Sequence, residues 1–379
     1  VPISSPDVTI DLNRDGYVDL LETASGTLYY GTPEGNYVVS TVGGTVVAKD
    51  LNGDDIVDYI VYGGELNEVK TLLYEGGGEF REETLIDNLA ADNPVWCYDF
   101  DKDGDVDILL TFSSLNTDGE TCYTLFFEND GTGNFTRHEE YQEHRWQYSL
   151  CRDVDNDGYY DLLLFSYDNP VPANIQYDDY EVQVMLRRGN GNLSFGEAEE
   201  LFSVTTTYYN ALRPDYPDYA ALSHWSIHAE DLDNDGYAEV WLSASPDFNS
   251  LPMPASVAKV PGRVNTLPAA PTGLRADYRP STGKLILSWN AATDAESSSK
   301  DLTYAIRIGS QPGQDDKVKG YAHADGRREN FVDGNAGSFL GRELDIRSWK
   351  PGTYYVSVQA VDPNHAGSPW SDEISFVHT

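Results

Sequence analysis

The chain has 379 residues, with 63 Asp or Glu against 25 Lys or Arg, and its formal net charge is −38. This length predicts two or three domains. The acidic excess argues against nucleic-acid and anionic-membrane partners, which need basic surfaces. No apolar run approaches the roughly 20 residues of a membrane span, so we expect no membrane insertion of this chain. Val1 does not begin a signal peptide, and the sequence is interpreted as a mature or trimmed soluble product.

An acidic loop of nine residues organises the first two thirds of the sequence. Its clearest copy reads Asp153-Val-Asp-Asn-Asp-Gly-Tyr-Tyr-Asp161. Oxygen-bearing side chains stand at positions 1, 3, 5 and 9, position 7 offers a backbone carbonyl, and glycine at position 6 permits a sharp bend. Oxygen ligands in a flexible loop are what Ca²⁺ requires. An EF-hand would continue into a helix, whereas an apolar, β-rich run follows here, so the loop is expected to join two strands.

The same register recurs in five copies, and this repetition favours structural Ca²⁺ sites over chance acidic turns. We expect up to five ions, with the second loop binding most weakly because Asp55 stands where the bend calls for glycine. Over a quarter of the acids of the chain lie at ligand positions of these loops. The predicted ligands are, in chain order, Asp11, Asn13, Asp15, Tyr17 and Asp19; Asp50, Asn52, Asp54, Ile56 and Asp58; Asp99, Asp101, Asp103, Asp105 and Asp107; Asp153, Asp155, Asp157, Tyr159 and Asp161; and Asp231, Asp233, Asp235, Tyr237 and Glu239.

A second element alternates with the loops, consisting of a strand, a glycine-rich turn and another strand. It occurs at residues 28–37, 72–80, 125–135 and 184–195. Each unit is therefore predicted as strand, acidic loop, strand, strand, glycine turn, strand. Four strands in a repeat of about 40–50 residues are typical of a β-propeller blade.

With these motifs, residues 1–265 resemble the FG-GAP/VCBS repeats of integrin-α-type propellers. The resemblance implies a calcium-stabilised propeller, usually of about seven blades, that is secreted or exposed at a cell surface. The chain departs from the family in showing only five motifs, and its fifth unit lacks a clear glycine hairpin. The number of blades and the closure of the ring stay open at this point.

A Pro-rich connection begins at Thr266, after which acidic loops stop and strands alternate at period 2. Residues 266–379 resemble a fibronectin type III domain, which implies a spacer or docking role. Trp289 is predicted as a core residue, and Tyr354 or Tyr355 as a packing corner. The predicted fold class is all-β, with a calcium-binding β-propeller over 1–265 followed by an Ig-like, fibronectin III-like β-sandwich over 266–379. Its strands are expected at 285–289, 302–308, 352–361 and 373–377.

Three cysteines, Cys97, Cys122 and Cys151, are an odd number and imply no disulfide framework. Cys97 and Cys151 each stand two residues before an acidic loop, where buried free thiols are expected. Millimolar extracellular Ca²⁺ suits many acidic loops of low affinity. We therefore expect an extracytoplasmic protein, secreted or displayed at a bacterial cell surface.

Segments that enter the first strand of each unit are expected on the face opposite the calcium loops. Aromatic residues beside Arg and His suit a glycan or a protein ligand. Packing between repeats is the simpler explanation of the same aromatic residues, and His228 is expected to be a hydrogen-bonded core residue. The candidate ligand-binding residues are Trp96, His144, Arg145, Trp146, Tyr208, Tyr209, Arg213, Tyr216, His224 and Trp225.

Three classes of function remain open on these observations. The first is a calcium-stabilised binding or adhesion protein that recognises a glycan or an extracellular protein. The second is a polysaccharide-cleaving, lyase-like enzyme in which His144, Arg145 or Tyr216 abstracts a proton. The third is a structural surface scaffold. The sequence contains no nucleophile motif, no H-E-x-x-H and no redox cysteine pair, which favours the first class over the second.

Overall fold

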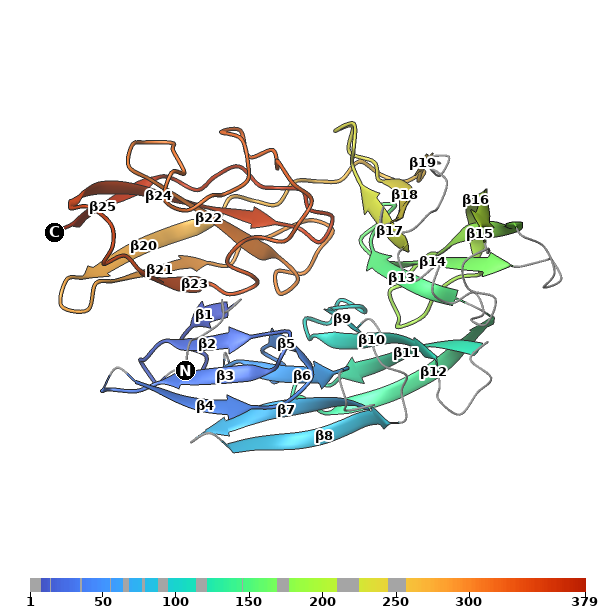
Figure 1. Ribbon diagram of the computed structural model, residues 1–379, viewed down its shortest axis with the longest axis horizontal. Helices are drawn as coiled ribbons and strands as arrows, with labels where there is room; N and C mark the ends of the chain where they lie inside the picture. The colour runs from blue at the N-terminus through green and yellow to red at the C-terminus, as the bar shows by residue number, and fades with distance from the viewer. Residues whose placement is uncertain are drawn as a thin grey trace. The chain divides into compact units, whose positions relative to one another are not determined.

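The computed structural model describes most of the chain and shows it to be all-β (Figure 1). No helix among the described residues is long and apolar enough to cross a membrane. The described residues are 8–13, 15–34, 36–54, 56–63, 68–76, 79–87, 95–113, 121–144, 146–168, 177–209, 225–244 and 257–379.

Residues before 266 form small antiparallel sheets in which consecutive strands are neighbours, so each sheet is a simple meander. Among the described residues, four of these sheets have four strands and one has three. The strands are β1 (Val8–Ile10), β2 (Asp19–Glu22), β3 (Thr27–Gly31) and β4 (Tyr37–Thr41); β5 (Thr45–Lys49), β6 (Asp58–Tyr62), β7 (Glu68–Gly76) and β8 (Glu79–Asp87); β9 (Val95–Tyr98), β10 (Asp107–Ser113), β11 (Thr121–Asn129) and β12 (Phe135–His144); β13 (Trp146–Arg152), β14 (Asp161–Asp168), β15 (Tyr177–Arg187) and β16 (Glu199–Tyr209); and β17 (Trp225–Glu230), β18 (Glu239–Ala244) and β19 (Val257–Lys259).

Each acidic loop joins the first two strands of one sheet, as the sequence predicts. The last loop residue is also the first residue of the second strand, and it pairs with the last residue of the first strand. This register is seen as Ile10 with Asp19, Lys49 with Asp58, Arg152 with Asp161 and Glu230 with Glu239. The predicted glycine turns likewise join the third and fourth strands of the four-stranded sheets. The internal order of the repeat is therefore confirmed.

The second strand of each sheet is apolar on both faces and lies in a core. Leu162 to Phe165 of β14 are all buried, and so are Ile108 to Leu110 of β10. Such continuous apolar runs are expected for strands covered on both sides. One core joins Leu12, Leu21 and Leu28 of the first sheet to Val46, Tyr59, Val61 and Leu72 of the second; another joins Leu163, Phe165, Val182 and Val184 to Ile227, Val240 and Leu242.

Residues 272–378 form two three-stranded antiparallel sheets around a single core, which is a β-sandwich. Four of the six strands match those expected from period-2 alternation, whereas the strands at Thr272–Arg279 and Gly341–Asp345 were not predicted. Trp289 is 5 % exposed within the core. Of the two tyrosines, Tyr354 is the packing corner. Its ring is buried in the core, and its hydroxyl donates a hydrogen bond to the backbone carbonyl of Lys350 at 2.7 Å. One sheet has the order β20 (Thr272–Arg279), β21 (Lys284–Asn290), β23 (Gly341–Asp345), and the other has β22 (Thr303–Gly309), β24 (Gly352–Val361), β25 (Ile374–His378).

Backbone contacts divide the chain into two compact units. The first comprises Val1–Ile108, Phe127–Arg137 and Thr266–Thr379, and the second comprises Leu109–Phe126 and His138–Asn265. This division groups residues 266–379 with residues 1–108, and the domain boundary expected between residues 265 and 266 stays a prediction. Within the described residues the sheets are separate meanders and a sandwich, and no closed propeller is shown. The propeller in the predicted fold class is corrected accordingly.

Candidate metal centres

In the first four loops, the acid at position 9 fastens the loop to the hairpin that follows it. One carboxylate oxygen of Asp107 accepts the backbone N–H of Phe100 at 3.1 Å, inside the loop, and the other accepts that of Asn129 at 2.9 Å, at the end of β11. Asp161 does the same with Val154 at 3.0 Å and Gly189 at 2.9 Å. Asp19 with Leu12 and Gly31, and Asp58 with Leu51 and Tyr74, repeat the arrangement.

Positions 1, 3 and 5 shape the loop by accepting its own backbone amides. In the fourth loop Asp153 accepts from Asp157 at 3.1 Å and Gly158 at 2.8 Å, while Asp155 accepts from Asp157 at 3.1 Å. Asp157 in turn accepts from Tyr159 at 2.8 Å. Such side-chain acceptance is how Asp and Asn stabilise tight turns. The carboxylates are thereby turned to one side of the loop.

A second left-handed residue in the loop escaped the sequence analysis. Glycine at position 6 has positive φ, as predicted, with 97° at Gly158. Position 4 has positive φ as well, at Gly53 (74°), Lys102 (65°), Asn156 (55°) and Asn234 (60°). Asn tolerates this region better than most residues, so the Asn at position 4 of two loops was the available signal. In the second loop Gly53 provides a left-handed residue, while Asp55 lies outside the described residues.

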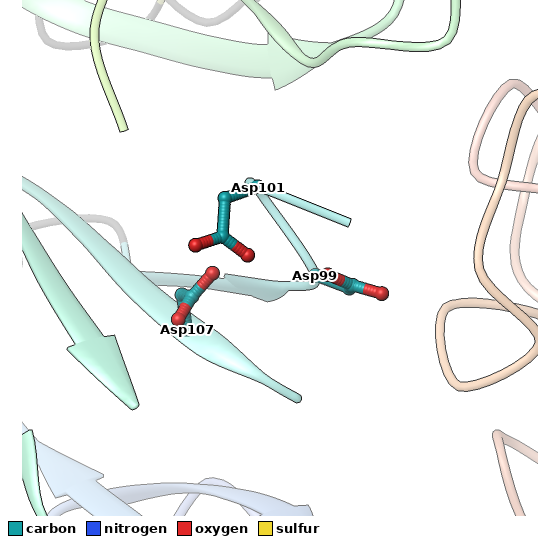
Figure 2. A group of neighbouring side chains, drawn as sticks. All are labelled: Asp99, Asp101 and Asp107. Carbon is teal, nitrogen blue, oxygen red and sulfur yellow. The ribbon is translucent and has the colours of Figure 1, made fainter. Parts of the chain in front are cut away.

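Three loops gather acidic side chains closely enough to share one ion. Figure 2 shows the group in the third loop, where Asp101 and Asp107 turn their carboxylates toward each other and Asp99 lies beside them. In each group one oxygen per residue lies within 4.8 Å of the others. In the first two loops, Asn13 and Asn52 replace the acid at position 3. The groups are Asp99, Asp101 and Asp107; Asp153, Asp155 and Asp161; and Asp231, Asp233 and Glu239.

Burial gives these acids unusual proton affinities. Desolvation, reinforced by neighbouring carboxylates, raises the pKa of Asp107 to about 8 and that of Asp161 to about 8. The same causes raise the pKa of Asp153 to about 7. The pKa values of Asp19 and Asp58 rise to about 6, again chiefly through burial. Without a counter-charge, ionising all the carboxyl groups of one loop at the same time therefore costs free energy.

The three groups differ in the cations that the protein itself supplies. No Lys or Arg among the described residues forms an ion pair with Asp99, Asp101 or Asp107. Arg188 pairs with Asp155 of the fourth loop. In the fifth loop the ammonium of Lys259 pairs with Asp235, which raises the pKa of Lys259 and lowers that of Asp235. Neither cation was identified from the sequence, because nothing in their sequence spacing links them to the loops.

The donor set fits Ca²⁺. Its ligands are oxygens at 2.3–2.6 Å, so two oxygens on one ion can lie up to about 5 Å apart. The groups within 4.8 Å satisfy this limit. Mg²⁺ demands shorter bonds and near-ideal octahedral geometry, and it usually keeps several waters. In the third loop, Asp99, Asp101 and Asp107 would hold the ion together with Asp103 and the carbonyl of position 7, and the ion would supply the missing positive charge.

The candidate ligand-binding residues are only partly placed. Trp96 lies half-buried in β9. His144, Trp146, Tyr208, Tyr209 and Trp225 lie in strands whose backbones are described but whose side chains are not. His228 of β17 is half-buried, stacks on Trp241 with ring centroids 5.0 Å apart, and shares a 2.7 Å hydrogen bond with the hydroxyl of Ser243. Arg145, Arg213, Tyr216 and His224 lie outside the described residues.

Two of the three cysteines are buried free thiols, as expected. Cys97 is 5 % exposed and Cys151 is 2 % exposed, and each lies in the first strand of its sheet. Burial raises the pKa of the Cys97 thiol to about 12, so it stays protonated. The side chain of Cys122 is not among those described. Neither buried thiol is suited to redox chemistry.

No protein-family model and no curated protein matches the chain. Among solved structures it is similar to the chicken CNTN1 FN1-FN3 domains, with 12 % identity and a TM-score of 0.26 over 88 % of this chain and 98 % of that one. It is also similar to the central fibronectin-III array of RIM-binding protein, with 11 % identity and a TM-score of 0.20 over 89 % and 98 % of the two chains. These scores are too low for any argument about strand positions or ligands.

The comparisons correct one expectation. The assignment to the FG-GAP/VCBS propeller family is wrong: no family model matches the chain, and its described sheets show no closed propeller. The physical reason for the error is that an antiparallel meander with apolar faces is a unit of sandwiches as well as of propellers. The repeated motif determines the loop and its sheet, but it does not determine how the sheets assemble.

Proposed function

We propose that the protein is an extracytoplasmic, Ca²⁺-stabilised protein of the binding or adhesion type. The observation that carries this proposal is the group Asp99, Asp101 and Asp107. Two of its members are buried, and its carboxylate oxygens lie within 4.8 Å of one another. Among the described residues no Lys or Arg forms an ion pair with these three carboxylates, while Lys300 pairs with Asp105 of the same loop at 3.7 Å. A divalent cation removes the repulsion and satisfies the oxygens at once.

Bound Ca²⁺ would stabilise the sheets because the ligands belong to the connection between two strands. In the third sheet, positions 1, 3 and 5 lie in the loop, whereas Asp107 at position 9 is the first residue of the second strand, β10. Asp107 also accepts the backbone N–H of Asn129, the last residue of the third strand, β11. Any ion that binds only the folded loop stabilises the fold, by about 2.7 kcal/mol at an ion concentration of 100 times Kd. Several loops of low affinity would suffice where Ca²⁺ is millimolar, which is the case outside cells.

The proposed partner is a glycan or an extracellular protein. The strongly acidic chain is unsuited to nucleic acid, and its small β-sheets offer a rigid support for exposed connections, where binding residues are commonly found. Trp96 and the aromatic residues at 146, 208, 209 and 225 remain the candidate anchors. The sandwich of residues 272–378 would then act as a spacer or docking module.

A parallel screen of the purified chain on glycan and extracellular-protein arrays tests this function. The screen is run in calcium and again in chelator. We expect binding in calcium that is lost in chelator and weakened by Trp96→Ala, with Trp349→Ala in the sandwich as the matched control. Absence of any ligand for a folded, calcium-loaded chain would contradict a binding function and favour a structural scaffold.

A further inference from the structure

The ammonium of Lys259 lies among the acids of the fifth loop. Besides its pairing with Asp235, it is 3.4 Å from a carboxylate oxygen of Glu239 and 3.6 Å from one of Asp233. It also lies 5.3 Å from the ring centre of Tyr237. These are loop positions 9, 5, 3 and 7, which are the positions predicted to ligate an ion. The lysine therefore pairs with three of the carboxylates that Ca²⁺ would contact, those of Asp233, Asp235 and Glu239.

Strand pairing explains how a residue twenty positions beyond the loop reaches it. Lys259 of β19 pairs directly with Glu239, the first residue of β18. An ammonium is a compact charge with three N–H donors, so it can donate hydrogen bonds to three carboxylates at once. The remaining acid, Asp231, uses its two oxygens to accept the amides of Asp235 and Gly236 at 3.0 and 2.9 Å. The ammonium thus offsets part of the negative charge of the loop, one cation against four acids.

The residue that faces position 9 differs in charge from sheet to sheet. The residue that follows position 9 pairs with Tyr29 in the first sheet, Leu72 in the second and Arg187 in the fourth. In an antiparallel pair, position 9 itself therefore lies opposite the next residue of the third strand, which is Tyr30, Leu73 or Arg188. In the third sheet the residue before the amide that binds Asp107 is Glu128. In every sheet, we call the residue of the third strand that lies opposite position 9 the facing residue. It is neutral in two sheets, acidic in the third, and basic in the fourth and fifth.

We propose that the ammonium of Lys259 takes the place of the ion in loop 231–239, which therefore needs no Ca²⁺. Loop 99–107, whose facing residue is Glu128, has no cation paired with Asp99, Asp101 or Asp107 among the described residues, since Lys300 pairs with Asp105 at position 7, and this loop takes the metal. The inference rests on the proposed function, since it assumes that loops without an internal cation bind Ca²⁺. It changes the expected ion content of the chain, because the fifth acidic loop is already occupied by a side chain.

The number of Ca²⁺ ions per chain tests this assignment. The full chain is stripped with chelator, reloaded with Ca²⁺, freed of unbound ion and counted by native mass spectrometry and atomic emission. Lys259→Met removes the charge while keeping most of the side-chain volume. Lys70→Met is the matched control, because Lys70 forms ion pairs with Glu68 and Glu82 on β7 and β8 and touches no loop ligand. We expect one more ion in Lys259→Met than in the wild type and no change in Lys70→Met.

A reciprocal variant keeps the test decisive if Lys259→Met folds poorly. Glu128→Lys places an ammonium at the facing position of the third loop, and it is expected to bind one ion fewer than the wild type. An unchanged count in Lys259→Met, with ions present in the wild type, overturns the role of Lys259 and leaves the proposed function standing. A wild type without ions overturns the proposed function; in that case the role of Lys259 survives if Lys259→Met binds one ion and falls if it binds none.

Discussion

Asp107 and Asn129 are joined by a 2.9 Å hydrogen bond from the backbone N–H of Asn129 to the carboxylate of Asp107. The other carboxylate oxygen accepts the amide of Phe100. The last acid of the loop is therefore a structural strut between loop and hairpin, whether or not an ion is present. This separates its role from that of the acids at positions 1, 3 and 5.

The variant Asp107→Asn is expected to destabilise the fold both in calcium and in chelator. An amide has one acceptor oxygen, so one of the two backbone donors is left facing an NH₂ group. The expected loss is about 1–3 kcal/mol in chelator, as for a buried donor without a partner. Urea unfolding under both conditions measures it. Asp101→Asn is the control, because its remaining oxygen can still accept the amide of Asp103; it should lose stability only in calcium. Equal behaviour of the two variants in chelator would contradict the strut role.

Gly191→Ala is expected to cost about 1–2 kcal/mol of folding stability. Gly191 has a φ of 67° in the turn before β16, and a Cβ there would lie 2.1 Å from a ring carbon of Tyr159, the residue at position 7 of the fourth loop. Gly196→Ala in the same turn is the control, since its Cβ would meet nothing closer than 3.6 Å. Thermal unfolding of both variants checks the difference, and an unchanged midpoint in Gly191→Ala would refute it.

Tyr354→Phe removes the hydroxyl that donates to the carbonyl of Lys350 and leaves the buried ring in place. We expect a loss of about 1 kcal/mol, the typical net worth of one hydrogen bond. Tyr355→Phe removes a hydroxyl from the neighbouring, less buried residue and should change stability by less than about 0.5 kcal/mol. Chemical unfolding of the full chain, followed through a signal from the sandwich, compares them. A larger effect in Tyr355→Phe would contradict the assignment of the packing corner.

His228 predicts a pH dependence of stability. Burial lowers its pKa below the ordinary 6.5; Glu230 opposes this shift and Arg152 adds to it, while Ser243 and Trp241 contact the ring. Because the folded state disfavours the protonated ring, the contribution of His228 is fully present above pH 6.5 and is lost as the pH falls through the folded pKa. His228→Gln should therefore flatten the fall in stability between about pH 7 and pH 5. Unfolding curves at several pH values measure this, and parallel profiles for both proteins would exclude a role for His228.

The local structure could be predicted from the sequence, whereas long-range relations could not. The acids at fixed offsets around Gly158 and the apolar run after Asp161 predict the loop and its two strands, and the structure has both. Period-2 alternation predicts four of the six strands of the sandwich and places Trp289 in its core. These features depend on residues that are neighbours in sequence.

The strut formed by Asp107 depends on the end of β11, and the pairing of Lys259 depends on the register of β19 against β18. No spacing rule links these residues, because strand pairing and register bring them together. The assembly of the sheets could not be predicted for a related reason. An apolar face on a meander shows that another part of the chain will pack against it, but the sequence does not show which sheet that is. The candidate anchors at Trp146 and Trp225 remain predictions, since their side chains are not described.

The most direct test of the account is calorimetric unfolding of the wild-type chain in calcium, in magnesium and in chelator. The account predicts a clearly higher midpoint in calcium than in chelator, with a free-energy gain of about 2–3 kcal/mol at an ion concentration near 100 times Kd. Magnesium should give little of this gain, because the loops supply flexible oxygen ligands rather than a strict octahedron. Superimposable curves under all three conditions would show that the acidic loops hold the fold through their own hydrogen bonds and would contradict the proposed role of Ca²⁺.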